Sequence, residues 1–317
     1  MRVKKALAVA LSAVLVVSTF GYTSWAADKE TNNPSAEKFE FVPGYVPGEL
    51  DGNAPVYEES DMARTASILP ESYPSSVEYI KSKYPANRNQ NPYGTCWAFS
   101  SIGLEEFDLI NDGMADKSID LSELALAYYT YNYVTDPLGG TEGDIAKYYN
   151  ENASKSYLDR GGNYQYSSRR LTQWIGATES DVSYDKATDT LTKGLDDKFA
   201  YSYKNAHLHN VYRINIKDNT SGVKETIIEH GAVGAMYMHI DNNMVFSKKA
   251  NRYTYYDNAS TGGGHAVMIV GWDDTFSKDN FEGLKPSNDG AWLMRNSWGD
   301  YCDYFWMSYD KIGRAHV

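Results

Sequence analysis

The stretch that decides the fold is residues 90–101, QNPYGTCWAFSS, which holds one of only two cysteines in the chain. Apolar residues recur at roughly helical spacing after Cys96, and Asn111-Asp112-Gly113 is typical of a helix end. The spacing therefore predicts a helix that begins near Cys96 and buries one face. Unpaired N–H groups and the positive dipole at a helix N-terminus stabilise an anion. We therefore expect Cys96 to form a thiolate, which is a ready nucleophile.

The composition is that of a globular protein with one large domain or two modest ones. The formal net charge is −12, and removing residues 1–26, which hold three basic residues and no acidic one, changes it to −15. A chain this acidic is a poor candidate for binding nucleic acid or an anionic membrane surface. We therefore expect no nucleic-acid partner.

Residues 1–26 have the three parts of a secretory signal: a basic start, an apolar core at residues 6–17 and a small-x-small site at Ser24-Trp25-Ala26. A membrane anchor is the alternative, but the apolar run is short for a membrane span. We expect a signal peptide that is cleaved, and hence a protein that is secreted or located at the cell surface.

Residues 27–68 are polar, rich in Pro, Gly and acidic residues, and without sustained periodicity, so they are expected to be a pro-segment or linker. The folded domain is expected to begin near Leu69. Helices are predicted after Cys96 and at residues 121–131, 167–174 and 221–230. Strands are predicted at residues 233–240, 265–272, 292–295 and 304–307. The fold class is therefore α+β, with a helical half, an antiparallel β-rich half and a cleft between them.

Residues 311–317, KIGRAHV, do not continue the strand that precedes them. They can be back-translated into a sequence that contains a common sequencing-adapter read. We interpret them as an artefact and expect the natural chain to continue past Asp310. The folded domain would then span residues 69–310 and be truncated at its C-terminus.

A thiol nucleophile needs a base within reach, and the base needs a third group that fixes its tautomer. His265 follows three glycines and opens an apolar strand, so it is the candidate base. Asn296 follows another apolar strand and is the candidate orienting group, with Trp298 able to shield their hydrogen bond. Gln90 and the backbone N–H of Cys96 can donate to a developing oxyanion. Taken singly, the histidine would be structural, the asparagine a turn residue and the glutamine without meaning.

Cysteine and histidine residues also serve in disulfides and metal sites. A disulfide between Cys96 and Cys302 would be incompatible with a nucleophilic Cys96, and no function is assigned to Cys302. A metal site is not expected, because the only close histidine pair, His207 and His209, has no evident third ligand. No cofactor is expected either.

Four separated motifs together resemble the papain family of cysteine peptidases, in the same chain order and over residues 69–310. They are QNPYGTCWAFS at residues 90–100, LSE at 121–123, GHAV at 264–267 and NSWG at 296–299. The resemblance implies a two-lobed fold with the active site in the cleft. It also implies that Cys96 attacks the scissile carbonyl, that His265 pairs with it and protonates the leaving amine, and that Asn296 orients His265. Gln90 and the Cys96 N–H would stabilise the oxyanion.

The resemblance also implies substrate-binding residues. Gly161 and Gly162 resemble the glycine pair whose backbone holds the substrate as an added strand. Asn163 and Tyr164 would lie near the subsites before the scissile bond, and Trp298 completes the expected set. The chain departs from the family pattern because the usual disulfides cannot form and the long helical pro-region is absent.

Insertions at residues 135–160 and 273–289 resemble those of a secreted bacterial branch that often carries a lectin-like region. The leading interpretation is therefore a secreted bacterial thiol endopeptidase acting on proteins or peptides. The alternatives are a catalytically idle surface-binding protein on the same fold, and an acyltransferase or amidase that uses the same Cys-His pair. A region beyond residue 310 would contact a surface glycan or the cell wall; the oligomeric state is not predicted.

Overall fold

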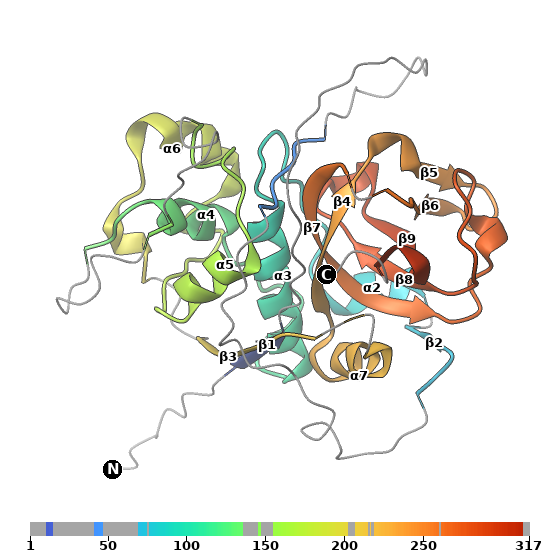
Figure 1. Cartoon of the computed structure of the whole chain (residues 1–317). Coiled ribbons are helices and arrows are strands. Elements are labelled where there is room, and N and C mark those ends of the chain that lie inside the picture. The colour runs from blue at the N-terminus through green and yellow to red at the C-terminus, as the bar shows by residue number, and fades with distance from the viewer. Residues whose placement is uncertain are drawn as a thin grey trace, which may run out of the picture.

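The computed structural model describes residues 11–14, 41–46, 69–74, 76–135, 145–146, 155–201, 207–214, 216, 219–259 and 261–312. Helix α3 (Cys96–Asn111) lies between a helical side and a sheet side, so the expected α+β architecture is confirmed (Figure 1). The helix begins at the predicted cysteine, and its first fourteen residues are buried.

The helical side contains α4 (Glu123–Tyr131), α5 (Tyr164–Leu171) and α6 (Ala187–Lys193), with α3 along its inner face (Figure 1). Ser122 caps α4 by accepting a hydrogen bond from the backbone N–H of Ala125 at 3.0 Å, as its sequence position suggested. Helix α5 begins three residues before the predicted position, because the side chain of Asn163 caps it by accepting from the Tyr166 N–H at 2.9 Å.

The sheet side is one seven-stranded sheet in the order β2-β7-β8-β9-β6-β5, with β4 also paired to β7. Its strands are β2 (Ser72–Tyr73), β4 (Val233–His239), β5 (Met244–Ser247), β6 (Arg252–Tyr255), β7 (Gly263–Asp273), β8 (Ala291–Arg295) and β9 (Tyr304–Ser308). All pairs are antiparallel except β6–β9, which is parallel. The four predicted strands are confirmed, whereas β5 and β6 were not predicted.

Two cores hold these layers together. One surrounds α3, which packs against β7 on one side and the helices on the other; the second lies between the sheet and α7 (Thr220–His230). Gly231 ends α7 in the left-handed conformation, with φ +87°, as the sequence predicted. The other elements are α2 (Val77–Lys83) and the 3-10 helices Tyr184–Lys186, Asp197–Phe199, Asp241–Asn243, Lys278–Asn280 and Gly299–Tyr301.

Both ends of the chain carry short elements. Strand β1 (Leu11–Val14) pairs in parallel with β3 (Leu208–Tyr212), so cleavage of the predicted signal would remove β1 from the mature protein. Helix α8 (Tyr309–Ile312) places Lys311 in a buried ion pair with Asp257, with Nζ and Oδ1 2.6 Å apart. Residues 313–317 lie outside the described residues. The signal peptide and the adapter-derived tail stay predictions.

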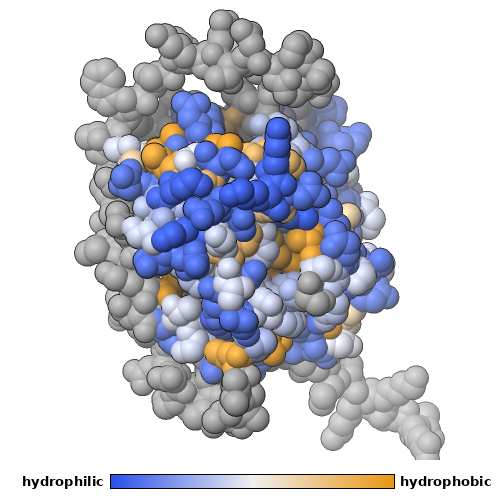
Figure 2. All heavy atoms as spheres, turned by 90° about the vertical axis from the view of Figure 1, so that its right-hand side faces the viewer, coloured by the Kyte–Doolittle hydropathy of each residue, from blue (hydrophilic) through white to orange (hydrophobic). Residues whose placement is uncertain are grey.

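The sheet-side face shown in Figure 2 is mostly hydrophilic, and its hydrophobic residues form small separate groups. Among the described residues, no helix has the length and apolar character needed to cross a membrane. Nothing on this face therefore suggests a large apolar docking surface.

Candidate active site

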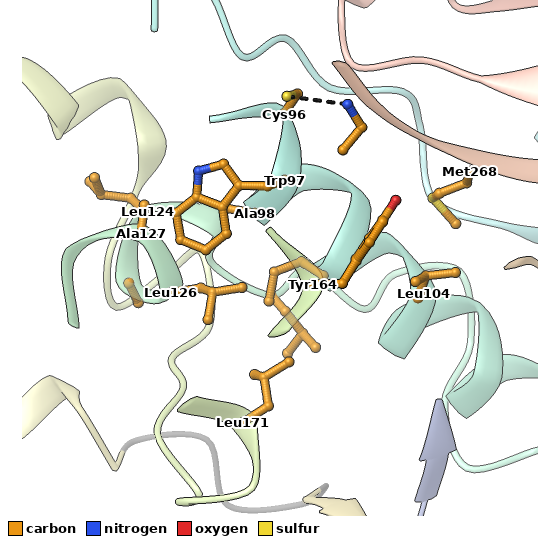
Figure 3. Packing of buried hydrophobic residues seen from close by; sticks show 14 of the residues in the cluster. Cys96, Trp97, Ala98, Leu104, Leu124, Leu126, Ala127, Tyr164, Leu171 and Met268 are labelled. Atoms are coloured by element: carbon orange, nitrogen blue, oxygen red, sulfur yellow. Dashed lines mark hydrogen bonds between the residues drawn. The ribbon is translucent and has the colours of Figure 1, made fainter. Parts of the chain in front are cut away.

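Cys96 is the first residue of α3 and is fully buried. Its Sγ accepts a hydrogen bond from the backbone N–H of Ala266, at 3.4 Å, which joins the helix to strand β7 (Figure 3). Ala266 follows His265, so the same strand that contacts the thiol also carries the candidate base. The candidate nucleophile and the candidate base are therefore brought to neighbouring positions by the packing of α3 against β7.

His265 is held by the predicted orienting residue. Its Nε2 lies 2.8 Å from Asn296 Oδ1, and Trp298 stacks on the imidazole with ring centroids 4.8 Å apart and an interplanar angle of 21°. An amide oxygen can only accept, so Nε2 carries the proton and Nδ1 is the nitrogen left to act as a base. Nδ1 has no hydrogen-bond partner among the described residues. The geometry agrees with the roles inferred for Asn296 and Trp298.

Gln90 is fixed from several sides. Its Oε1 accepts from Ser297 Oγ at 2.6 Å, its Nε2 donates to the Tyr93 carbonyl at 2.9 Å, and its backbone N–H donates to the Ser297 carbonyl at 2.9 Å. Because the amide nitrogen has two hydrogens, one remains for an oxyanion. Ser297, which we did not assign a role from the sequence, therefore links the oxyanion donor to the loop that carries Asn296.

Residues 41–46, which we call the leader, cross the N-terminal end of α3 (blue in Figure 1). Gly162 donates to the Gly44 carbonyl and accepts from the Val46 N–H, both at 2.8 Å, and Tyr45 forms a parallel bridge with Gly162. The Gly264 carbonyl accepts from the N–H groups of Gly44 and Tyr45 at 3.2 and 3.0 Å. The leader thus joins both sides of the molecule over Cys96.

The leader presents the wrong group to the nucleophile for cleavage. The Gly44 N–H interacts with Cys96 Sγ, whereas the Gly44 carbonyl points to the Gly162 N–H. A Cβ on Gly44 would lie 2.9 Å from Cys96 Sγ and 2.3 Å from the Gly94 carbonyl oxygen. Only glycine fits at this position, and the Gly44 carbonyl is turned away from the thiol.

Burial under the leader sets the charge state of the site. Loss of solvent raises the pKa of the Cys96 thiol to about 12, although backbone N–H groups around it act in the opposite direction. Burial and the nearby His239 lower the pKa of His265 to about 3, despite its bond to Asn296. In the covered form the thiol and imidazole are therefore both neutral at pH 7. The expected thiolate is not the state of this form, because burial outweighs the helix end.

The predicted substrate-binding residues meet the leader. Gly161 has φ +74°, and a Cβ on it would lie 2.7 Å from Val46 Cγ2. Asn163 Nδ2 donates to the Val46 carbonyl at 3.1 Å. Tyr164 contacts the ring of Tyr45 at 5.9 Å between centroids, but its hydroxyl lies in the core beside Ser100 and the Val267 carbonyl. Gly161, Gly162 and Asn163 can thus hold an extended chain, and Tyr164 lies beneath them.

Two features of the site were not found from the sequence. The leader has no periodic pattern and was assigned only to a pro-segment or linker. The sequence predicts His239 only as a strand residue, whereas in the structure its ring centroid lies 6.2 Å from that of His265. Cys96 and Cys302 are both free thiols, so the disulfide alternative is wrong. Among the described residues, no group of three or more His, Cys, Asp or Glu side chains is placed to hold a metal ion.

A sequence profile described as papain family cysteine protease matches residues 73–316. A cysteine protease from Blomia tropicalis is 29% identical over 227 residues, which are 69% of this chain and 55% of that protein. The solved cysteine protease and lectin-like domains of Cwp84, a surface layer associated protein of Clostridium difficile, are similar with a TM-score of 0.58 and 27% identity. That similarity covers 78% of this chain and 49% of the other, so this chain spans about half the length of these relatives.

A similarity that covers nearly all of the other protein is also seen. Xylellain, a cysteine protease from Xylella fastidiosa, is similar with a TM-score of 0.54 and 21% identity, covering 88% of this chain and 95% of that one. At this identity the similarity shows the fold alone.

Proposed function

The chain belongs to the papain family of cysteine proteases, and we propose that it is an endopeptidase that cleaves proteins or peptides through Cys96, His265 and Asn296. The single observation that supports this most strongly is the His265 Nε2 to Asn296 Oδ1 hydrogen bond of 2.8 Å. It leaves Nδ1 for proton transfer on the strand whose next residue, Ala266, contacts the Cys96 sulfur. A binding protein would gain nothing from this arrangement.

In the proposed reaction His265 Nδ1 takes the thiol proton of Cys96, and the thiolate attacks the substrate carbonyl carbon. The Cys96 N–H and one Gln90 Nε2 hydrogen stabilise the resulting oxyanion. The C–N bond then breaks as His265 returns its proton to the amine, which leaves an acyl-enzyme. Water, deprotonated by His265, hydrolyses the thioester and regenerates the thiol.

The leader is proposed to be an inhibitory pro-segment. Support comes from its contacts: it covers the nucleophile, occupies both hydrogen-bonding groups of Gly162 and holds the thiol and imidazole in their neutral forms. At the sulfur the leader presents the Gly44 N–H, and the Gly44 carbonyl is bound by Gly162. Release of the leader would rehydrate the pair and allow the thiolate to form.

The proposed location is outside the cell. Support comes from the predicted signal at residues 1–26 and from the similarity to Cwp84, which is a surface layer associated protein. A natural C-terminal extension that contacts a surface glycan would fit the lectin-like domain of that relative. These points concern location and partners and do not alter the chemistry of the site.

Product analysis tests the proposal. The full chain carrying Gly44→Val, a change that displaces the leader by steric clash, would be incubated with a denatured protein in ¹⁸O-labelled water. We expect new internal termini whose carboxyl groups contain one ¹⁸O. Cys96→Ala should abolish cleavage, while the matched Cys302→Ser, which removes the other buried thiol, should retain it.

Three outcomes would contradict the endopeptidase. Products that lack ¹⁸O but carry an added amine would indicate acyl transfer. Release of peptidoglycan fragments without protein cleavage would indicate an amidase. Absence of all turnover by a folded Gly44→Val protein would indicate a binding protein.

A further inference from the structure

A second imidazole lies beside the proposed catalytic pair and has no part in the mechanism above. His239 is the last residue of β4, and its side chain is 2% exposed. Its ring centroid lies 6.2 Å from that of His265 and 5.1 Å from that of Trp298. The β4–β7 pairing, which sets Tyr237 opposite His265, brings it there. The proposed reaction leaves this buried imidazole, beside the candidate base, without a role.

Both ring nitrogens of His239 are used inside the protein. Nδ1 lies 2.9 Å from the Tyr237 hydroxyl, and Nε2 lies 3.0 Å from Asp241 Oδ1. Tyr255 stacks on one side of the ring, with centroids 5.5 Å apart and an interplanar angle of 22°. The imidazole therefore has no nitrogen left for a substrate, and what it offers is the flat surface of its ring.

That surface is occupied by the leader. The ring of Phe41 lies 4.5 Å from His239, 5.2 Å from His265 and 5.6 Å from Trp298, between centroids. The angles between the ring planes are 54°, 83° and 62°, which are the tilted and edge-to-face arrangements that aromatic rings prefer. These three rings form a ring pocket that already accommodates an aromatic side chain.

The position of the ring pocket along the leader indicates its side of the scissile bond. Gly44 lies at Cys96, and Tyr45 and Val46 continue toward Gly162 on the side expected to bind the acyl half of a substrate. Phe41 lies three residues away in the opposite direction and touches His265 itself. The ring pocket therefore faces the leaving amine and the first residue attached to it.

The charges around the ring pocket disfavour an acidic side chain. The Asp241 carboxylate, 72% exposed, lies 3.0 Å from His239 Nε2, and Asp257 adds a second, buried carboxyl group near the ring. No cation is left over among these residues to bind a carboxylate. Burial lowers the pKa of His239, which keeps the ring neutral at pH 7. A flat, uncharged side chain is thus the occupant that these groups fit.

We propose that His239 and Trp298, together with His265, form a specificity pocket for an aromatic side chain on the first residue after the scissile bond. The proposal rests on the peptidase function proposed above. The enzyme would then select its substrates by the residue after the scissile bond as well as by the residues before it, which Gly162 holds. Phe41 of the leader is the internal occupant of that pocket.

Competition between acyl acceptors tests the pocket directly. The full chain with Gly44→Val would react with a peptidyl-aminomethylcoumarin, whose leaving group contains no amino acid, in the presence of either phenylalaninamide or alaninamide. An acceptor that fills the pocket diverts the acyl-enzyme from hydrolysis to transfer. We expect phenylalaninamide to be favoured by about 3- to 10-fold, the range given by one aromatic pair.

Variants at His239 give the decisive comparison. The acceptor ratio is the rate of acyl transfer to phenylalaninamide divided by the rate of transfer to alaninamide. His239→Ala, which removes the ring, should bring this ratio close to one. His239→Phe, which restores a flat ring, should recover the parent ratio. The ratio is measured within each variant, so a change in overall rate does not affect it. If His239→Ala does not fold, His239→Phe together with Trp298→Leu serves the same purpose.

The outcomes separate this proposal from the proposed function. Release of coumarin by the Gly44→Val chain tests the peptidase alone. If coumarin is released but the parent acceptor ratio is near one, or alaninamide is preferred, the pocket proposal is overturned while the peptidase stands. A parent ratio that is unchanged in His239→Ala would also overturn it. If no coumarin is released, both fail.

Discussion

The surface covered by the leader has two halves that meet at Cys96, and they hold the chain differently. On the Gly162 side, Gly44, Tyr45 and Val46 are fixed by backbone hydrogen bonds of 2.8 to 3.2 Å. On the His239 side, Phe41 is held by contacts with three rings at centroid separations of 4.5 to 5.6 Å. Backbone groups are the same in every residue, so the first half sets position, whereas the rings distinguish one side chain from another.

Glycine is needed wherever the leader passes close to the protein, including Gly263, where a Cβ would lie 2.8 Å from the Phe41 ring. A Cβ on Gly162 would lie 2.4 Å from the Trp97 ring, and a Cβ on Gly264 would lie 2.2 Å from the Tyr45 carbonyl oxygen. Glycine lets two backbones approach to hydrogen-bonding distance. On the other half, the aromatic rings provide apolar contact area and a shape that a flat side chain can match.

The largest loss of activity is expected from substitutions of the candidate catalytic residues, which lie where the two halves meet. His265→Ala removes the base and should lower kcat/KM by about 10³-fold or more, whereas Asn296→Ala only frees the imidazole to rotate and should cost about 10²-fold. Both are measured in the Gly44→Val chain with the coumarin substrate. The acceptor ratio of Asn296→Ala should stay above one, since His239 and Trp298 of the ring pocket remain. Equal residual rates in the two variants would refute the orienting role of Asn296.

Gly44→Val should displace the leader from both halves of the covered surface. Its side chain would meet the Gly94 carbonyl and Cys96 Sγ, so the leader must move away and water must reach the thiol. On a Cys302→Ser background, the rate of Cys96 alkylation at pH 7 should rise by about 100-fold or more, because the thiol pKa falls from about 12 toward and below that of a free thiol.

Gly283→Val is the matched control for that experiment, because a Cβ there meets only a Val245 methyl group at 3.2 Å, far from the leader in sequence. It should leave the rate unchanged. An alkylation rate that is already high in the parent chain, and equal in Gly44→Val, would mean that the leader does not cover Cys96 in solution.

Protonation of His265 at acid pH should favour release of the leader from the site. The pKa of His265 is lowered to about 3 under the leader and returns toward about 6.5 once the leader leaves, so the uncovered form binds more protons below pH 6.5. With respect to this imidazole, the cover is most stable above that pH and weakens as the pH falls toward 3. In a Cys96→Ser chain, where no thiol titrates in the opposite direction, the rate at which an acid-tolerant protease cuts within the leader should therefore rise by about tenfold between pH 7 and pH 5, relative to an unfolded control peptide. A relative rate that does not change with pH would contradict this linkage.

The smallest effect is expected for a single hydrogen bond of the Gly162 side. Asn163→Ser keeps a side chain able to cap α5 but loses the donor to the Val46 carbonyl. KM for a peptide that extends before the scissile bond should rise about 3- to 10-fold, the value of one hydrogen bond. The acceptor ratio should not change. A change in that ratio with constant KM would show that the two halves are not independent.

Much of the site could be predicted because its parts are local. The helix start at Cys96, the glycines before His265 and the apolar strand before Asn296 each follow from short-range patterns. The position of the leader could not be predicted in the same way. Residues 41–46 have no periodicity, and their place depends on hydrogen bonds to Gly162 and Gly264, which lie far away in the sequence. His239 was likewise visible only as a strand residue until the β4–β7 register was known.

The sequence by itself determined which groups are available: a cysteine at a helix start, a histidine at a strand, an asparagine after another, and a glutamine before them all. Only the tertiary structure decided their charge state and their neighbours. A helix end favours a thiolate, but that preference acts in competition with solvation, and solvation depends on everything that covers the sulfur. With the leader in place the sulfur is fully buried and burial raises the pKa of the thiol, so the segment that covers the site, and not the helix end, sets its charge.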